Sequence, residues 1–216
     1  IRLGRTVNFD ALTKEISDLL KPFASADPKR KVLNAPHWNG KDGEAVATDG
    51  RVLAVMIGKK NPKPRKDESG YPNYAQVIPS YQEGKVPNPD KADAIEIKVD
   101  SDRLTRKLMQ ALSLYKDVEK IQPTVKLWLT ADGQIEVSTK AEDVGEYSSL
   151  GDKPGFELGI FNPDYLMDTL TFLRKTGNET PTLFITSKNH PALFTGKSEY
   201  AINMPLRIEG WTVDRD

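Results

Sequence analysis

The hydrophobic pattern of the chain repeats three times. Each repeat has an extended segment, an amphipathic helix and further extended segments that can pair as hairpins. The helices are predicted to start near residues 8, 101 and 162, and in each of them apolar residues recur at spacings of three and four, as on one buried helix face. This order of elements predicts an α+β fold in which antiparallel sheets pack on helices.

Local signals place the ends of the helices. Asn162 followed by Pro163 is a strong start signal, because asparagine caps a helix and proline fits its first position. In the first helix, Asn8 or Asp10 is the expected cap, and Pro22 marks the end because proline cannot continue a helix interior.

Alternating or apolar segments between turn residues predict the strands. Asp49-Gly50 and Asp132-Gly133 are tight-turn dipeptides, and each lies between two such segments as in a hairpin. Extended segments are predicted at 31–38, 44–48, 52–57, 94–99, 125–129, 135–139, 156–160, 182–187, 192–195 and 200–205.

The segment 71–79, YPNYAQVIP, separates unequal parts of the chain. Pro72 and Pro79 each favour an extended backbone in the residue before them, and the side chains between them alternate, so an extended connector is predicted. The basic, proline-rich stretch before it is either a solvated loop or a loop that contacts phosphate.

These patterns predict how the chain is divided. The expected domains are a half unit at 1–58, a loop and linker at 59–93, a complete two-unit domain at 94–208 and a C-terminal extension at 209–216. The first unit has no evident partner within the chain.

Composition narrows the class of protein. With 38% hydrophobic and 29% charged residues, the 216-residue chain is typical of a globular protein. Lys+Arg and Asp+Glu both number 31, which argues against nucleic-acid binding through overall basicity but allows a basic stripe on one face. No apolar run approaches the roughly 18 residues of a membrane span. No signal peptide is visible, Ile1 is not expected to be the natural start, and a cytoplasmic protein is expected.

The sequence offers little catalytic chemistry. The absence of cysteine excludes disulfides, thiolate metal sites and cysteine nucleophiles. The only histidines, His37 and His190, fit no metal or triad spacing. Asp164 and Asp168 lie four residues apart on a predicted helix, but Asp164 is explained as an acid of the first turn. We therefore predict a non-enzymatic protein with no cofactor and no metal site.

Four segments resemble the bacterial DNA polymerase III β sliding clamp, in the same order. Residues 47–55, ATDGRVLAV, resemble the ATDGHRLAV segment of its middle domain, and 71–79 resemble the FPDYxxVIP passage that joins its middle and last domains. Residues 161–166, FNPDYL, resemble the FNxxYL start of a last-domain helix, and 204–208, MPLRI, resemble the C-terminal MPMRL. The chain thus resembles half of the middle domain plus the last domain, as in a truncated or divergent member with the DNA-clamp fold.

The chain also departs from the family pattern. Full-length clamps have three domains of two units each, whereas this chain has three units in all. Arg51-Val52 replaces the usual His-Arg pair after the ATDG motif, and the chain extends past the usual terminus through a segment that contains Trp211.

The resemblance implies a groove that binds short linear peptides of DNA polymerases and repair proteins. Such a groove needs apolar walls and a few polar anchors. For Leu53, Val77, Met204 and Leu206 the alternative is core packing. The positions carried over are Thr48, Gly50, Arg51, Leu53, Pro72, Val77, Asn162, Tyr165, Met204, Pro205, Leu206 and Arg207.

The resemblance also implies helices that face double-stranded DNA without reading its sequence. A merely solvated helix face is the alternative for each candidate. The DNA-facing candidates are Arg103, Arg106, Lys107, Gln110, Lys14, Lys21, Arg174 and Lys175.

The family resemblance leads to two hypotheses about function. Clamp rings hold twelve units, so three units per chain imply a homo-oligomer of four chains that acts as a DNA replication processivity factor. The alternative is a non-ring adaptor or competitor that binds clamp-interaction peptides without encircling DNA. A degenerate relative that has lost both activities is a third possibility.

Overall fold

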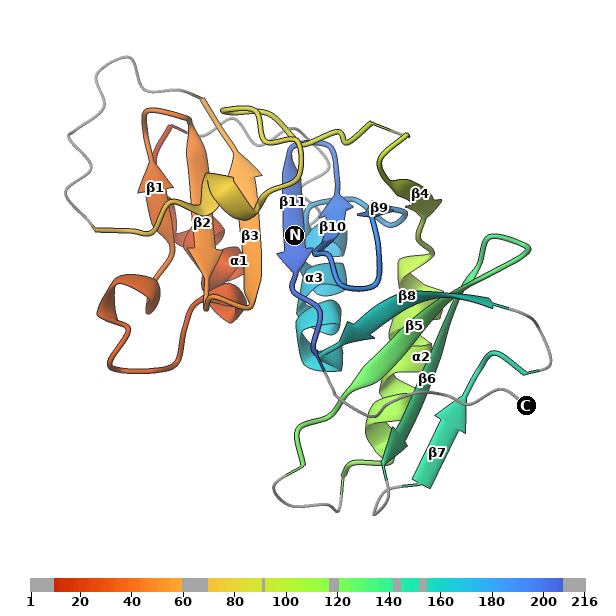
Figure 1. The fold of residues 1–216 in the computed structure, drawn as a ribbon. Helices are drawn as coiled ribbons and strands as arrows, with labels where there is room; N and C mark the ends of the chain where they lie inside the picture. Colours follow the sequence, from red (N-terminus) through yellow and green to blue (C-terminus); the bar gives the residue numbers. More distant parts are fainter. Residues whose placement is uncertain are drawn as a thin grey trace.

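The computed structural model describes residues 10–59, 70–90, 92–116, 121–141, 145–151 and 155–207. Every strand pairing among them is antiparallel, in two sheets backed by helices (Figure 1). The helices are α1 (Lys14–Leu20), α2 (Ser101–Ser113) and α3 (Pro163–Lys175), with 3-10 turns η1 (Lys21–Phe23), η2 (Lys31–Leu33) and η3 (Tyr74–Val77). The predicted α+β class is confirmed.

The larger sheet has seven strands in the order β1-β2-β3-β11-β10-β9-β4. They are β1 (His37–Asn39), β2 (Glu44–Thr48), β3 (Val52–Ile57), β4 (Ile95–Lys98), β9 (Thr182–Ile185), β10 (Ala192–Thr195) and β11 (Glu199–Asn203). The smaller sheet has four strands in the order β7-β6-β5-β8. They are β5 (Val125–Thr130), β6 (Ile135–Ala141), β7 (Gly145–Ser148) and β8 (Gly155–Phe161).

One seam joins the first unit to the rest of the chain. Strand β3 pairs with β11 over five residues, from Val52 opposite Asn203 to Met56 opposite Glu199. Behind the seam, the rings of Phe23 and Phe172 meet edge to face with centroids 5.4 Å apart. The first unit therefore has a partner within the chain, which corrects the sequence-based interpretation.

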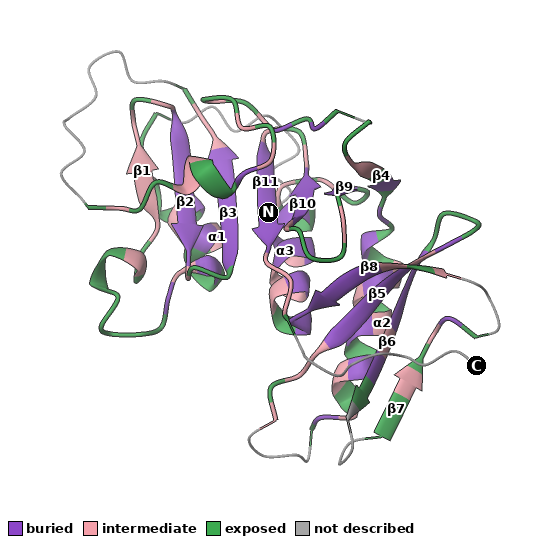
Figure 2. Ribbon diagram, in the orientation of Figure 1, coloured by how far each residue is buried: buried purple, intermediate pink, exposed green. Residues whose placement is uncertain are grey.

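The two faces of the seven-stranded sheet are covered differently. Because side chains alternate along a strand, Ala54 and Met56 of β3 lie in the core that contains the helices, while Leu53 and Val55 face the other way. On that outer face they pack with Ile78 and with residues of β10 and β11. Figure 2 shows β2 and β11 as buried along their whole length, and β3 as buried except at its last residue, Ile57.

Three predicted elements differ from the structure. The first helix begins at Lys14 rather than near residue 8, because the Thr13 side chain accepts a hydrogen bond from Ile16 N; Asn8 lies outside the described residues. Residues 31–38 are not extended throughout. The Asn34 amide donates to the carbonyls of Ser25 and Asp27, which curls the chain into η2 before β1 starts.

The segment 71–79 is also not an extended connector. Residues Tyr74–Val77 form η3, and the Asn73 side chain caps it by accepting a hydrogen bond from Ala75 N at 3.2 Å. This local cap overrides the alternation that favoured an extended backbone. At α3 the capping prediction is confirmed, because Asn162 Oδ1 accepts from Asp164 N at 2.8 Å and Pro163 begins the helix.

Candidate peptide-binding surface

The turn between β2 and β3 has a geometry that its sequence requires. Thr48 Oγ1 donates to the Val52 carbonyl at 2.6 Å and accepts from Gly50 N at 3.0 Å. Gly50 has a φ of 91°, a left-handed conformation that favours glycine. A Cβ there would lie 3.1 Å from Arg30 Nη1, the end of an exposed side chain, so the φ angle is the main reason for glycine at this position.

The Asp49 carboxylate fixes this turn and ties it to α3. Its Oδ1 accepts from Arg51 N at 2.7 Å and from Val52 N at 3.0 Å. Its Oδ2 accepts from the Tyr165 hydroxyl at 2.6 Å. Burial and the Asp49 carboxylate raise the pKa of Tyr165 to about 12, and the Arg51 guanidinium acts in the opposite direction. Arg51 and Tyr165 therefore lie close together at this point.

The C-terminal segment after β11 completes the assembly. Met204 N donates to the Arg51 carbonyl at 2.9 Å, and Leu206 N donates to the Ile160 carbonyl at 2.8 Å. The segment thus bridges the β2–β3 turn and the end of β8. We call the surface formed by residues 49–51, 164–165 and 204–207 the junction surface.

The segment 71–79 reaches the same region from the outer face of the sheet. The ring of Tyr71 stacks on His37 with centroids 4.7 Å apart, and its pKa is raised to about 12 by burial, against a smaller opposite effect of a backbone hydrogen bond at Thr48. Ile78 is buried in the outer apolar cluster, against which Met204 packs. The structure therefore brings all four resembling segments together.

The predicted groove residues differ in exposure. Leu53 is only 3% exposed and belongs to the outer apolar cluster, so it is a core residue. Val77 is 43% exposed and is available to a partner, as are the exposed side chains of Pro72 and Arg51. Leu206, Pro205 and Met204 are half-buried.

Glu44 is a residue that the sequence analysis missed. It lies in β2 with its side chain fully buried. Its carboxylate accepts from the Tyr74 hydroxyl at 2.7 Å, the Tyr81 hydroxyl at 3.2 Å and Gly84 N at 3.0 Å. It therefore fastens the chain after residue 70 onto the sheet. The available signal was its place on the same strand face as Val46, within a strand that is otherwise apolar or small.

Burial raises the pKa of Glu44, and the donors that surround it only partly offset this effect. The ring of Tyr74 meets Tyr71 and Tyr81 edge to face, with centroids 6.4 and 6.5 Å apart. The pKa of Tyr74 is raised as well, first by burial and then by the charge of Glu44. This network holds Tyr74, Tyr81 and Gly84, and with them the chain after residue 70, against the sheet.

A separate hollow lies beside β4, away from these segments. It is a shallow, open depression of about 510 Å³, lined by Ala92, Asp93, Ala94, Ile95, Glu96 and Thr186. None of the twelve predicted groove residues lines it. It is therefore not the predicted groove.

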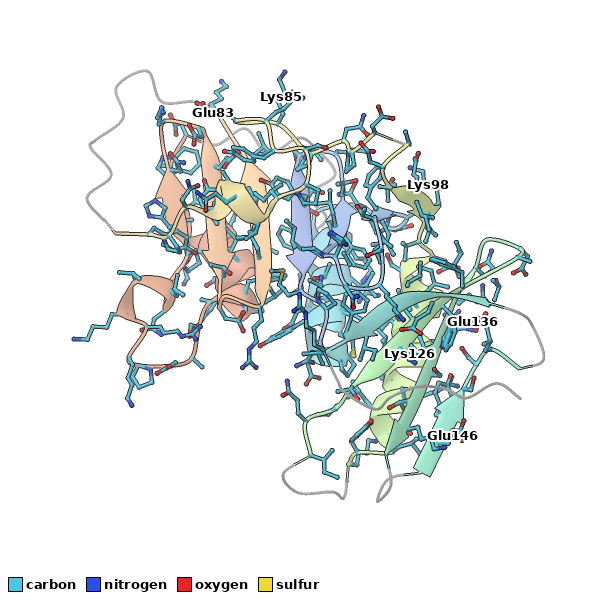
Figure 3. The ribbon with its side chains drawn as sticks, viewed as in Figure 1. Glu83, Lys85, Lys98, Lys126, Glu136 and Glu146 are labelled. Carbon is cyan, nitrogen blue, oxygen red and sulfur yellow. The ribbon has the colours of Figure 1, made fainter. Side chains whose placement is uncertain are left out.

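Two DNA-facing candidates of α2 are engaged within the chain. Arg103 Nη2 donates to Glu136 Oε1 at 2.5 Å, and Lys107 Nζ pairs with Glu136 Oε2. Glu136 lies on β6 and is labelled in Figure 3. Burial tends to raise its pKa, but hydrogen bonds from Lys107 and Ser149 and the two positive charges hold that pKa below its usual range.

The other DNA-facing candidates have various surroundings. Arg174 Nη1 contacts Asp102 Oδ1 at 2.9 Å, an exposed pair between α3 and α2. Gln110 Oε1 accepts from the Tyr147 hydroxyl at 2.7 Å. The remaining candidates are exposed: Lys14, Lys21, Arg106 and Lys175.

Solved structures of bacterial sliding clamps share this fold. The match to the DNA polymerase sliding clamp from Bacillus subtilis has a TM-score of 0.63 at 19% identity, over 88% of this chain and 63% of that chain. The match to the DNA polymerase III β chain from Streptococcus pneumoniae TIGR4 has a TM-score of 0.68 at 19% identity, over 94% of this chain and 67% of that chain. The match to the sliding clamp from Bartonella birtlesii, solved bound to griselimycin, has a TM-score of 0.64 at 18% identity, over 88% of this chain and 62% of that chain.

These matches establish the fold of the bacterial DNA polymerase III β sliding clamp for this chain, as the resembling segments predicted. The chain spans 63% of the length of the Bacillus subtilis clamp. No protein-family model and no curated protein matches the sequence. Within the described residues, no helix is long and apolar enough to cross a membrane.

Proposed function

We propose that this chain is a sliding-clamp-like DNA replication processivity factor that holds DNA polymerases or repair proteins by short linear peptides. One observation carries this proposal. Three of the four resembling segments contribute to the junction surface, where Asp49 and Tyr165 are joined across 116 residues by a 2.6 Å hydrogen bond. The fourth, 71–79, reaches the same region through the outer apolar cluster, which contains Ile78 and against which Met204 packs. Rigid backbone, half-buried apolar side chains and exposed Val77 are what a peptide-binding surface requires.

The solved clamps add support for ligand binding at this fold. The Bartonella birtlesii clamp was solved bound to griselimycin, and a Pseudomonas aeruginosa clamp was solved with a ligand. We extend this property to the present chain as part of the proposal. The protein would act without catalysis, in the cytoplasm, where replication partners are present.

Peptide titration tests the proposal directly. A fluorescein-labelled clamp-binding peptide should show saturable anisotropy with the full chain. Weak linear-motif complexes have dissociation constants on the order of micromolar, about −8 kcal/mol. Absence of saturation below the millimolar range would rule out the peptide-binding function.

Encirclement of DNA by a homo-oligomer is a separate part of the proposal. Four chains of three units each would supply the twelve units of a closed ring. In such a ring the seven-stranded and four-stranded sheets would be extended at their edges by neighbouring chains. Multi-angle light scattering should then give a mass of about four chains. A strictly monomeric mass at all concentrations would remove the ring.

A second candidate function is a non-ring adaptor or competitor for clamp-binding peptides. It is favoured by the pairing of Arg103 and Lys107 with Glu136, and of Arg174 with Asp102, because paired cations contribute less to phosphate binding. The two functions differ in a DNA-binding assay. The adaptor binds peptide but shows no affinity for duplex DNA at low salt, whereas the processivity factor shows affinity that falls steeply with salt.

A further inference from the structure

The Arg51 guanidinium stands out among the charges of the junction surface. Arg51 is exposed, and its backbone is held on both sides, by Asp49 Oδ1 at its N–H and by Met204 N at its carbonyl. Among the described residues, no carboxylate lies within ion-pairing distance of its guanidinium. The backbone of Arg51 is therefore fixed. Its guanidinium contacts the Tyr165 hydroxyl but no carboxylate of the described residues, so its positive charge is available to a partner.

In the observed arrangement the neighbouring Asp49 carboxylate accepts hydrogen bonds from other donors and forms no ion pair with the Arg51 guanidinium. Both oxygens of Asp49 are already used, by the backbone N–H groups of Arg51 and Val52 and by the Tyr165 hydroxyl. The Arg51 guanidinium instead lies near the Tyr165 hydroxyl, whose pKa it lowers.

Two further arginines add positive charge, Arg30 at the same turn and Arg207 elsewhere on the junction surface. Arg30 Nη1 donates to the Asp49 carbonyl at 2.7 Å, while Arg30 Nε contacts Asp27 at 3.8 Å. Arg207 is exposed at the end of the segment whose Met204 N contacts Arg51. Exposed Asp164, beside Tyr165 on α3, is the acid that can partly offset them.

We propose that the junction surface selects linear peptides with acidic side chains beside their apolar anchors, and that Arg51 determines this specificity by pairing with a peptide carboxylate. This inference rests on the proposed peptide-binding function and names the class of partner. Planar guanidinium matches carboxylate geometry and can donate two parallel hydrogen bonds, which favours acidic over neutral or basic peptides. Charge complementarity of this kind sets specificity more than total affinity.

Three peptides with the same apolar anchors test the inference. Their flanking positions carry two aspartates, two serines or two lysines, and each is titrated into the full chain at low salt. We expect the aspartate peptide to bind about fivefold tighter than the serine peptide, as for a single exposed ion pair. The lysine peptide should bind weakest, and the differences should shrink in about 0.5 M NaCl because salt screens exposed charges.

Arg51→Glu and a matched control locate the effect. Arg51→Glu should reverse the order, so that the lysine peptide binds tightest. Lys197→Glu makes the same change in net charge in the turn before β11, at the opposite end of that strand, and should leave the order intact. Asp164→Asn should strengthen binding of the aspartate peptide modestly, by removing the offsetting charge.

The outcomes separate this inference from the function on which it rests. If all three peptides bind with equal affinity and Arg51→Glu changes nothing, acidic selectivity is wrong while peptide binding stands. If Lys197→Glu alters the order as much as Arg51→Glu does, net charge rather than Arg51 is responsible. If none of the peptides binds, the peptide-binding function itself fails, and the inference fails with it.

Discussion

The Asp49 side chain performs two structural tasks with one carboxylate. It closes the β2–β3 turn through the N–H groups of Arg51 and Val52, and it receives the Tyr165 hydroxyl from α3. The first task is local and follows from the Asp-Gly dipeptide. The second depends on where α3 lies. It is therefore visible only in the folded chain.

Tyr165→Phe and Asp49→Ala should separate these two tasks. Loss of one hydrogen bond in Tyr165→Phe should lower the free energy of unfolding by about 1 kcal/mol. Asp49→Ala also leaves backbone donors without their partner, and should cost about 2–3 kcal/mol. Urea denaturation followed by circular dichroism measures both. Equal stability of Tyr165→Phe and the parent chain would show that the 2.6 Å contact contributes nothing in solution.

Glu44 gives the protein a pH dependence of predictable sign. Burial raises its pKa in the folded state, so the folded protein holds this proton more tightly than the unfolded chain does. The stabilisation that comes from this tighter proton binding is complete below the unfolded carboxyl pKa of about 4.3. It is lost as pH rises through the raised pKa of the folded state, because the buried carboxyl then has to ionise. We expect Glu44→Gln, which does not titrate, to become relatively more stable than the parent chain as pH rises from about 4 to 7.

The measured quantity for Glu44 is the difference in unfolding free energy between the parent chain and Glu44→Gln, because the subtraction removes the contribution of the other titrating groups. Unfolding free energies of the parent and Glu44→Gln are compared at each pH by urea denaturation. A difference that stays constant with pH would contradict the raised pKa. A constant offset added to the expected trend would report only the altered hydrogen bonds to Tyr74 and Gly84.

At the scale of elements, the segment 71–79 carries the main functional prediction. Its inner side chain Ile78 is buried at 5% exposure, whereas Val77 at 43% is not. Truncating exposed side chains therefore costs little stability, about 0.5 kcal/mol or less. The segment can then be tested for binding without unfolding the sheet below it.

Pro72→Ala combined with Val77→Ala should weaken binding of the clamp-binding peptide by about tenfold, on the order of 1.4 kcal/mol, because exposed apolar contact area is lost. Anisotropy titration measures the affinity, and circular dichroism should show unchanged folding. Met109→Ala is the control, since Met109 is 57% exposed on α2, outside the junction surface. Unchanged peptide affinity in the double variant would remove the segment from the site.

At the scale of the whole molecule, the β3–β11 seam decides how the chain behaves. It places β1, β2 and β3 in one seven-stranded sheet with the C-terminal strands β9, β10 and β11, with α1 and α3 behind them in one core. A shared sheet and a shared core are typical of a single cooperative unit. Independent unfolding of the first unit is therefore not expected.

Two tryptophans report on the two ends of this unit. In a Trp211→Phe background, Trp128→Phe leaves only Trp38 of β1, and Trp38→Phe leaves only Trp128 of β5. Urea unfolding of each variant is followed both by fluorescence and by circular dichroism. Circular dichroism gives the midpoint of the whole molecule, including any shift that the substitution itself causes. The fluorescence midpoint should equal that value in both variants. A fluorescence midpoint that differs from the circular dichroism midpoint of the same variant would mean that the first unit unfolds on its own.

Prediction from the sequence succeeded where a few adjacent residues fix the conformation. Asn162 and Pro163 start α3, and Asp49-Gly50 closes a hairpin, because capping and left-handed turns are satisfied by local atoms. It failed at η3, where alternation around Tyr74 favoured an extended backbone. There a side-chain cap at Asn73 and the distant carboxylate of Glu44 set the conformation instead.

The sequence by itself determined the α+β class, most of the strands, α2, α3 and the four segments that resemble a sliding clamp. These features are specified by the short-range periodicity of apolar residues and by the order of motifs along the chain. Only the tertiary structure decided that β3 pairs with β11, that Glu44 holds the chain after residue 70, and that Arg103 and Lys107 face Glu136. These contacts join residues far apart in sequence, so no local pattern specifies them, and burial of apolar surface with satisfaction of buried polar groups selects among them.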